Sequence, residues 1–129
     1  MLNGWLKNTT DMETKFNFNS QVCTSRSQSE RLLAIGLKPE TADFPVWGTE
    51  KLLYMGWSLH RLLCLIPKEI ELSFGKWVCI NINYDYNIIY LNDNQDDFVG
   101  FYEGSIYNKA IDCIEWLIKE GYFNKEYLV

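Results

Sequence analysis

Apolar positions repeat at helical spacing in three segments of the chain. The first predicted helix covers roughly residues 25–36. Two capping boxes fit its start: Ser25 with Gln28, and Ser27 with Glu30. A second helix is expected to begin after the cap Ser58 and to end at Pro67, and a third to begin after Ser105 and to end at Gly121.

Between the second and third helices the apolar period changes from helical to two, which is typical of strands. Ile70, Leu72 and Phe74 alternate with polar residues, and Gly75-Lys76 fits a hairpin turn with Gly in its first central position. Further strands are expected over residues 77–84, 88–91 and 98–102. A short strand is expected over 52–55, and an irregular stretch over 38–48.

These elements predict an α+β fold in which an antiparallel meander of three to five strands packs against about three helices. The chain of 129 residues has the length of one domain, which we place at residues 21–129. Residues 1–20 are interpreted as an extension that is either poorly ordered or docked as an edge strand through Trp5 or the Phe16/Phe18 alternation. Met12 is a candidate alternative translation start.

The charge and hydropathy of the chain narrow the classes of partner. A net charge of −5 and scattered basic residues oppose direct binding of nucleic acid. The longest apolar run, residues 62–66, is too short to span a bilayer, and the N-terminus has no signal pattern, so we expect a cytoplasmic protein. The cysteines, which lack any C-x-x-C spacing, are interpreted as reduced, small hydrophobic residues: Cys23, Cys64, Cys79 and Cys113.

The sequence predicts no catalytic, cofactor-binding or metal-binding set. His60 is the only histidine, and no nucleophile motif accompanies it. The acidic segment 92–97 resembles a calcium loop only in part, because Asp97 stands where Gly is needed and the flanking segments are strands. It is interpreted as a solvated turn. Glycine-rich phosphate loops are absent.

Aromatic residues make up 16% of the chain, more than a domain of this size readily buries. Tyr and Trp are enriched among the residues that dominate protein interfaces. The candidate interaction surface consists of Trp47, Trp57, Tyr86 and Tyr102. Most of the other rings are expected to pack in the core and on the sheet.

Several segments resemble small uncharacterised proteins of gut Bacteroidetes, their phages and other mobile elements. The segments that carry the resemblance are residues 23–33, residues 36–43 (Gly-Leu-Lys-Pro-Glu-Thr-Ala-Asp), Trp57-Ser58-Leu59 before Leu62-Leu63 and Pro67, and residues 116–118 with 121–123. Ser27 and Ala34 depart from the usual pattern, in which Glu and a charged residue stand at these positions. The resemblance implies a bacterial or phage origin and a shared fold, and it brings no known activity.

Three functions remain open from the sequence. The first is a non-enzymatic interaction or accessory protein of a mobile element, which follows from the surplus of rings and the missing catalytic motifs. The second is an acidic mimic of nucleic acid that inhibits a host DNA-binding enzyme, using Asp85, Asp93, Asp96 and Asp97. The third is a small enzyme that uses His60 with a carboxylate.

Overall fold

The computed structural model describes residues 20–129, which form three α-helices, two 3-10 helices and two antiparallel sheets. The elements are α2 (Arg26–Ala34), η1 (Pro39–Thr41), β1 (Phe44–Trp47), β2 (Leu52–Gly56), α3 (Leu59–Leu65), β3 (Glu69–Ser73), β4 (Lys76–Ile82), β5 (Ile88–Leu91), β6 (Asp97–Phe101), α4 (Ile106–Glu120) and η2 (Lys125–Tyr127). The α+β prediction is confirmed. The predictions for residues 1–19 lie outside the described part of the chain.

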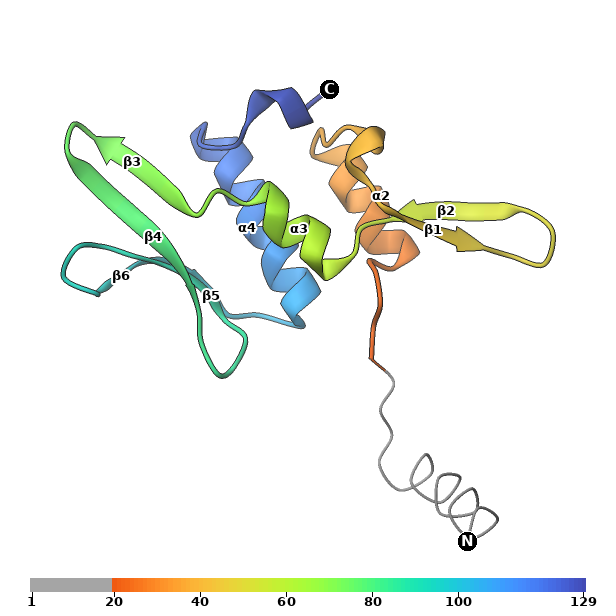
Figure 1. Cartoon of the computed structure of the whole chain (residues 1–129), viewed down its shortest axis with the longest axis horizontal. Coiled ribbons are helices and arrows are strands. Elements are labelled where there is room, and N and C mark those ends of the chain that lie inside the picture. Colours follow the sequence, from red (N-terminus) through yellow and green to blue (C-terminus); the bar gives the residue numbers. More distant parts are fainter. Residues whose placement is uncertain (1–19) are drawn as a thin grey trace, which may run out of the picture.

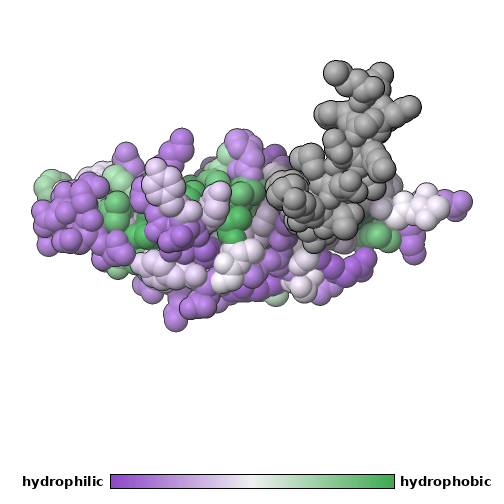
Figure 2. All heavy atoms as spheres, turned by 90° about the horizontal axis from the view of Figure 1, so that it is seen from below, coloured by the Kyte–Doolittle hydropathy of each residue, from purple (hydrophilic) through white to green (hydrophobic). Residues whose placement is uncertain are grey.

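The helices lie between the two sheets. The meander β3-β4-β5-β6 stands at one end of the long axis, and the β1-β2 hairpin projects at the other (Figure 1). α4 contacts β5 and β6 on one side and α2 and α3 on the other, and α2 contacts β2. Seen from below, hydrophobic residues show as separate patches between hydrophilic ones (Figure 2).

Serine caps begin all three described α-helices, as predicted. Of the two candidate capping boxes, the one that forms joins Ser25 and Gln28: the Gln28 N–H donates to Ser25 Oγ, and the Ser25 N–H donates to the Gln28 side chain at 2.9 Å. Ser58 and Ser105 each accept one backbone N–H of the following turn. Gly121 ends α4 with a φ of 80°, a left-handed conformation that glycine adopts without steric cost.

One hydrophobic cluster joins the helices to the meander. α4 supplies the largest share, since it buries residues on successive turns: Tyr107, Ala110, Ile111, Cys113, Ile114 and Leu117. Leu32 from α2 and Leu62 from α3 are also completely buried. The C-terminal tail packs back on this body, because Leu128 bridges Leu37. The meander and α2 are thus held against the same helix.

A strand occupies part of the stretch that was expected to be irregular. β1 pairs with β2, with Phe44 opposite Gly56 and Pro45 opposite Met55. Pro45 weakened the strand signal because proline cannot donate to a ladder, yet proline is tolerated at the edge of a sheet. β1 forms because β2 pairs with it, and the prediction of an irregular stretch is therefore wrong for Phe44–Trp47.

The β3-β4 turn also differs from its prediction. Ser73 pairs with Lys76, so the turn residues are Phe74 and Gly75, and Gly75 stands in the second central position with a φ of 75°. Phe74 is consequently not part of the buried stripe but fully exposed. The left-handed residue that closes the turn decides the register, and only Gly75 suits it.

The β4-β5 and β5-β6 connections are the same five-residue loop built twice, over residues 83–87 and 92–96. Each begins with an Asn whose Oδ1 accepts two backbone N–H groups at 3.0 Å. The fourth residue of each loop, Tyr86 or Gln95, has a positive φ. The Asn92 side-chain oxygen is therefore engaged by its own turn, in agreement with the interpretation of this segment as a solvated turn.

Candidate functional site

The four aromatic residues of the candidate interaction surface do not lie together. Trp47 is 66% exposed on the β1-β2 hairpin, whereas Tyr86 lies in the β4-β5 loop and Tyr102 directly follows β6, next to the four-stranded sheet at the other end of the molecule (Figure 1). Tyr102 covers Gly100 and donates to the Asp97 carboxylate at 2.8 Å. Hydrogen bonding to Asp97, together with some burial, raises the pKa of the Tyr102 phenol.

Trp57 is a core residue and was wrongly predicted to lie on the surface. Its side chain is 1% exposed, and its Nε1–H donates to Thr41 Oγ1 at 2.9 Å. The Thr41 hydroxyl in turn donates to the Lys38 carbonyl at 2.7 Å. A buried indole needs such a partner for its N–H, so the η1 turn and the Trp57 ring fix each other's position.

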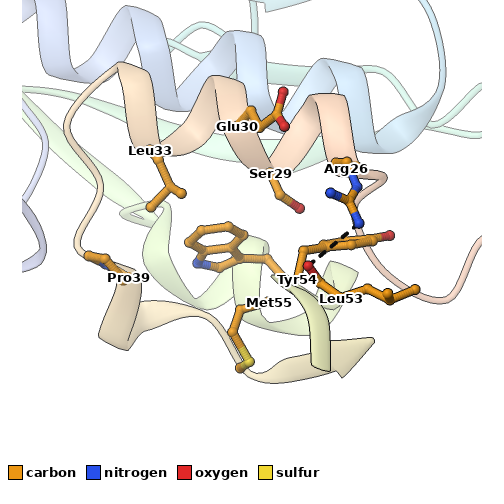
Figure 3. A pocket seen from close by; sticks show the side chains of 9 residues that line it. Arg26, Ser29, Glu30, Leu33, Pro39, Leu53, Tyr54 and Met55 are labelled. Carbon is orange, nitrogen blue, oxygen red and sulfur yellow. Dashed lines mark hydrogen bonds between the residues drawn. The ribbon is translucent and has the colours of Figure 1, made fainter. Parts of the chain in front are cut away.

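A groove lies between α2 and β2 (Figure 3), and Trp57, which is almost fully buried, closes its floor. The groove has a volume of about 360 Å³ and is lined mainly by apolar atoms. Its lining residues are Arg26, Ser29, Glu30, Leu33, Pro39, Leu53, Tyr54, Met55 and Trp57. Leu33 and Leu53 stand on opposite walls and are 43% and 42% exposed. The groove thus offers apolar surface to a ligand without further opening.

Arg26 places a positive charge at one end of the groove. Its guanidinium lies 5.3 Å from the centre of the Tyr54 ring and donates weakly to the Leu53 carbonyl at 3.5 Å. Within residues 20–129 it makes no ion pair, since the ion pairs found there belong to Arg31. A guanidinium held on a ring keeps free donors for a carboxylate.

A buried chain of hydroxyl groups ties the two walls together. Trp57 N–H donates to Thr24 Oγ1 at 2.9 Å, and Thr24 Oγ1 lies 2.8 Å from Ser29 Oγ. Because the Ser29 hydroxyl donates its only proton to the Ser25 carbonyl, Thr24 must be the donor to Ser29. The chain runs from the end of β2 to the first turn of α2, so it fixes the width of the groove at this end.

Tyr54 adds a further link between β2 and the segment before α2. Its hydroxyl donates to the Thr24 carbonyl at 3.2 Å. Burial raises the pKa of the Tyr54 phenol, and the neighbouring Cys23 raises it further. The phenol therefore remains a protonated donor, and its ring remains in place beneath Arg26.

Apart from Trp57, none of the groove residues was predicted from the sequence to contribute to a site. One signal was present: Leu32 and Leu33 are adjacent on a short helix, so both cannot lie on one buried stripe. Leu32 is buried and Leu33 is exposed. The contribution of Arg26 could not be predicted, because its partner Tyr54 comes from a strand 28 positions later.

The other predicted chemistry is not assembled. His60 is exposed, and its ring contacts the Cys64 thiol rather than a carboxylate, so a His60–carboxylate pair is not formed within the described residues. Asp85 lies in the β4-β5 loop, while Asp93, Asp96 and Asp97 lie around the β5-β6 loop at the other end of β5. This division removes the geometric support for a mimic of nucleic acid.

The cysteines divide into two pairs. Cys23 and Cys113 are buried, as expected of small hydrophobic residues, and burial raises the pKa of the Cys113 thiol to about 12. Cys64 and Cys79 are exposed, so the prediction that they act as small hydrophobic residues is wrong for these two. All four are free thiols.

No described helix has the length and apolar character to cross a membrane.

Comparison of the chain with family models, curated proteins and solved structures finds no significant match. The groove and its surroundings are therefore the observations that bear on function.

Proposed function

We propose that this chain is a non-enzymatic interaction protein that binds a segment of a partner protein in the groove between α2 and β2. The observation that carries the proposal is one concave surface that combines a Trp57 floor, two exposed leucine walls and a guanidinium without an ionic partner among residues 20–129. Exposed apolar surface of this kind is typical of binding sites.

The chemistry of the groove defines the ligand. A large apolar side chain would pack between Leu33 and Leu53, above the buried Trp57, and burying such a side chain contributes about 1.5–3 kcal/mol. A carboxylate of the same segment would accept from Arg26, which favours acidic over basic segments. Glu30 on the α2 wall limits this preference, because it repels a second acidic group, so one acidic residue suits the groove best.

The resemblance to proteins of Bacteroidetes and their mobile elements supports the narrower proposal of an accessory protein that acts in a bacterial cytoplasm. The net charge of −5 favours a protein partner over direct binding of nucleic acid. The Ser29 hydroxyl in the lining donates its proton to the Ser25 carbonyl and lies against Thr24, so it is not placed to act as an activated nucleophile.

Selection of a random peptide library displayed on phage, with the full chain as bait, tests the proposal. We expect the selected peptides to share a large apolar residue and one Asp or Glu. Leu53→Glu should weaken their binding at least tenfold, a loss of about 1.4 kcal/mol or more. Arg26→Gln should weaken the acidic peptides more than variants of the same peptides in which the acid is replaced by its amide.

Leu52→Glu is the matched control. Leu52 and Leu53 are neighbours on β2 with nearly equal exposure, 43% and 42%, but only Leu53 lines the groove. Binding should survive Leu52→Glu, and circular dichroism should show that both variants keep the fold. The proposal is wrong if no peptide is enriched, or if the two leucine variants bind the selected peptides equally well.

A further inference from the structure

The exposed face of α3 brings together the only histidine of the chain and one of its exposed cysteines. His60 and Cys64 are four residues apart and therefore one helical turn apart on the same face. The outer ring nitrogen of His60, Nε2, lies 3.4 Å from Cys64 Sγ. Neither side chain has another hydrogen-bond partner among the described residues.

The distance between these two atoms matches one edge of a zinc coordination tetrahedron. Zinc binds a histidine nitrogen at about 2.0–2.1 Å and a cysteine sulfur at about 2.3 Å. At the tetrahedral angle, these bond lengths separate nitrogen and sulfur by about 3.5 Å. The pair can therefore hold one Zn²⁺ ion with little movement of either side chain.

We propose that His60 and Cys64 form one half of a zinc site, and that the same two residues of a second copy of this chain complete it. Structural zinc is almost always bound by four ligands. Within residues 20–129 no group of three or more potential ligands occurs, so this part of one chain supplies the pair with no third or fourth ligand. Because the chain has one histidine, a site with two His and two Cys requires two chains.

The proposed site is balanced in charge and symmetry. Each Cys64 thiol releases its proton to solvent on binding, each imidazole binds in its neutral form, and two thiolates neutralise Zn²⁺. A two-fold axis through the metal makes the two halves equivalent. Arg61, which neighbours the pair on α3, interacts electrostatically with Asp43, and that carboxylate offsets its charge.

Titration of the full chain with Co²⁺, in buffer that contains a phosphine reductant to keep the thiols reduced, tests the site. Zn²⁺ is then added to compete for the bound Co²⁺. We expect the intense visible bands of tetrahedral cobalt and a thiolate charge-transfer band, both saturating at one metal per two chains. Sedimentation equilibrium should show that Zn²⁺ doubles the mass and that a chelator reverses the change. His60→Ala and Cys64→Ala should each abolish the bands and the mass change.

Cys79→Ala is the matched control, because Cys79 is the other exposed cysteine and lies on β4 without a histidine. Saturation at one metal per chain, an unchanged mass, or a cobalt spectrum that persists in His60→Ala overturns the proposal. Loss of the spectrum in Cys79→Ala overturns it as well. The groove variant Leu53→Glu should leave the spectrum intact, so this proposal and the proposed function fail independently.

Discussion

The hydroxyl chain through Thr24 allows a quantitative test of how the groove is held together. Thr24→Val keeps the shape of the side chain but replaces the Oγ1 that accepts the Trp57 N–H at 2.9 Å. Thr24 is completely buried, so no water replaces the lost acceptor. An unsatisfied buried N–H costs about 1–3 kcal/mol. Ser29 stays satisfied, because it still donates to Ser25.

Thr24→Ser separates the hydrogen bonds from the packing. Serine keeps the acceptor for Trp57 and the donor for Ser29, and it loses only a buried methyl group, which costs about 1 kcal/mol. The expected order of stability is therefore wild type, then Thr24→Ser, then Thr24→Val. The free energy of unfolding of the valine variant should be about 2–3 kcal/mol lower than that of wild type. Besides the lost hydrogen bond, the valine methyl group that replaces Oγ1 would lie 2.9 Å from the Trp57 nitrogen, which is too close for a carbon atom.

Urea unfolding, monitored by tryptophan fluorescence and circular dichroism, measures these differences from the transition midpoints and slopes. A Thr24→Val variant within about 0.5 kcal/mol of wild type would refute the assignment of a buried relay, since surface substitutions commonly change stability by that amount. A serine variant that is less stable than the valine variant would refute it too, because packing would then outweigh hydrogen bonding.

Two further predictions concern the turns and the start of α3. Gln95→Gly should stabilise the fold by about 0.5–1 kcal/mol in urea unfolding, because Gln95 has a φ of 64°, which glycine adopts without strain. Asn94→Gly is the control: its position has no positive φ, so glycine there should destabilise the fold. Equal effects of the two substitutions would contradict the reasoning. Burial alone would raise the pKa of Asp43, but hydrogen bonds from the Ser58 hydroxyl and N–H and the charge of Arg61 outweigh it and lower this pKa below 3.8. The stabilisation by Asp43 is therefore present above the ordinary carboxyl range and is lost as pH falls through the folded-state pKa. In thermal melts, the Tm of wild type should exceed that of Asp43→Asn at neutral pH, and this difference in Tm should shrink below about pH 4. A difference in Tm that stays constant with pH would contradict the assignment.

Local signals predicted the elements whose cause is local. Ser58 and Ser105 stand directly before periodic apolar residues, and Ser25 stands three residues before the Gln28 that completes its capping box, so each helix start is determined by a few neighbouring positions. The strand β5 and the end of α4 at Gly121 were likewise predicted, because a short apolar run between two polar turns and a glycine after the last helical residue are both local signals.

Elements that depend on distant partners escaped prediction. β1 exists because β2 pairs with it, and Pro45 obscured the strand signal. Trp57 looked like a surface candidate, but Thr41 and Thr24 come from elsewhere in the chain to satisfy its two N–H groups. The His60–Cys64 spacing was visible, whereas the 3.4 Å contact depends on the rotamers of both side chains. The pattern of a single sequence predicts where helices and strands end and which side of each is buried. It does not predict which helices and strands pack against one another.

Trp57 and Ser58 connect the groove to the helix that carries the His60–Cys64 pair. The two sites should nevertheless respond differently to mutation. Trp57 faces inward as the groove floor, and Ser58 caps α3, from which His60 and Cys64 face outward. The position of Trp57 depends on Thr24, whereas the His60–Cys64 distance is set within a single helical turn. Thr24→Val should therefore weaken the binding of selected peptides through a displaced indole, while the cobalt spectrum stays unchanged. A loss of both would show instead that α3 itself depends on the relay.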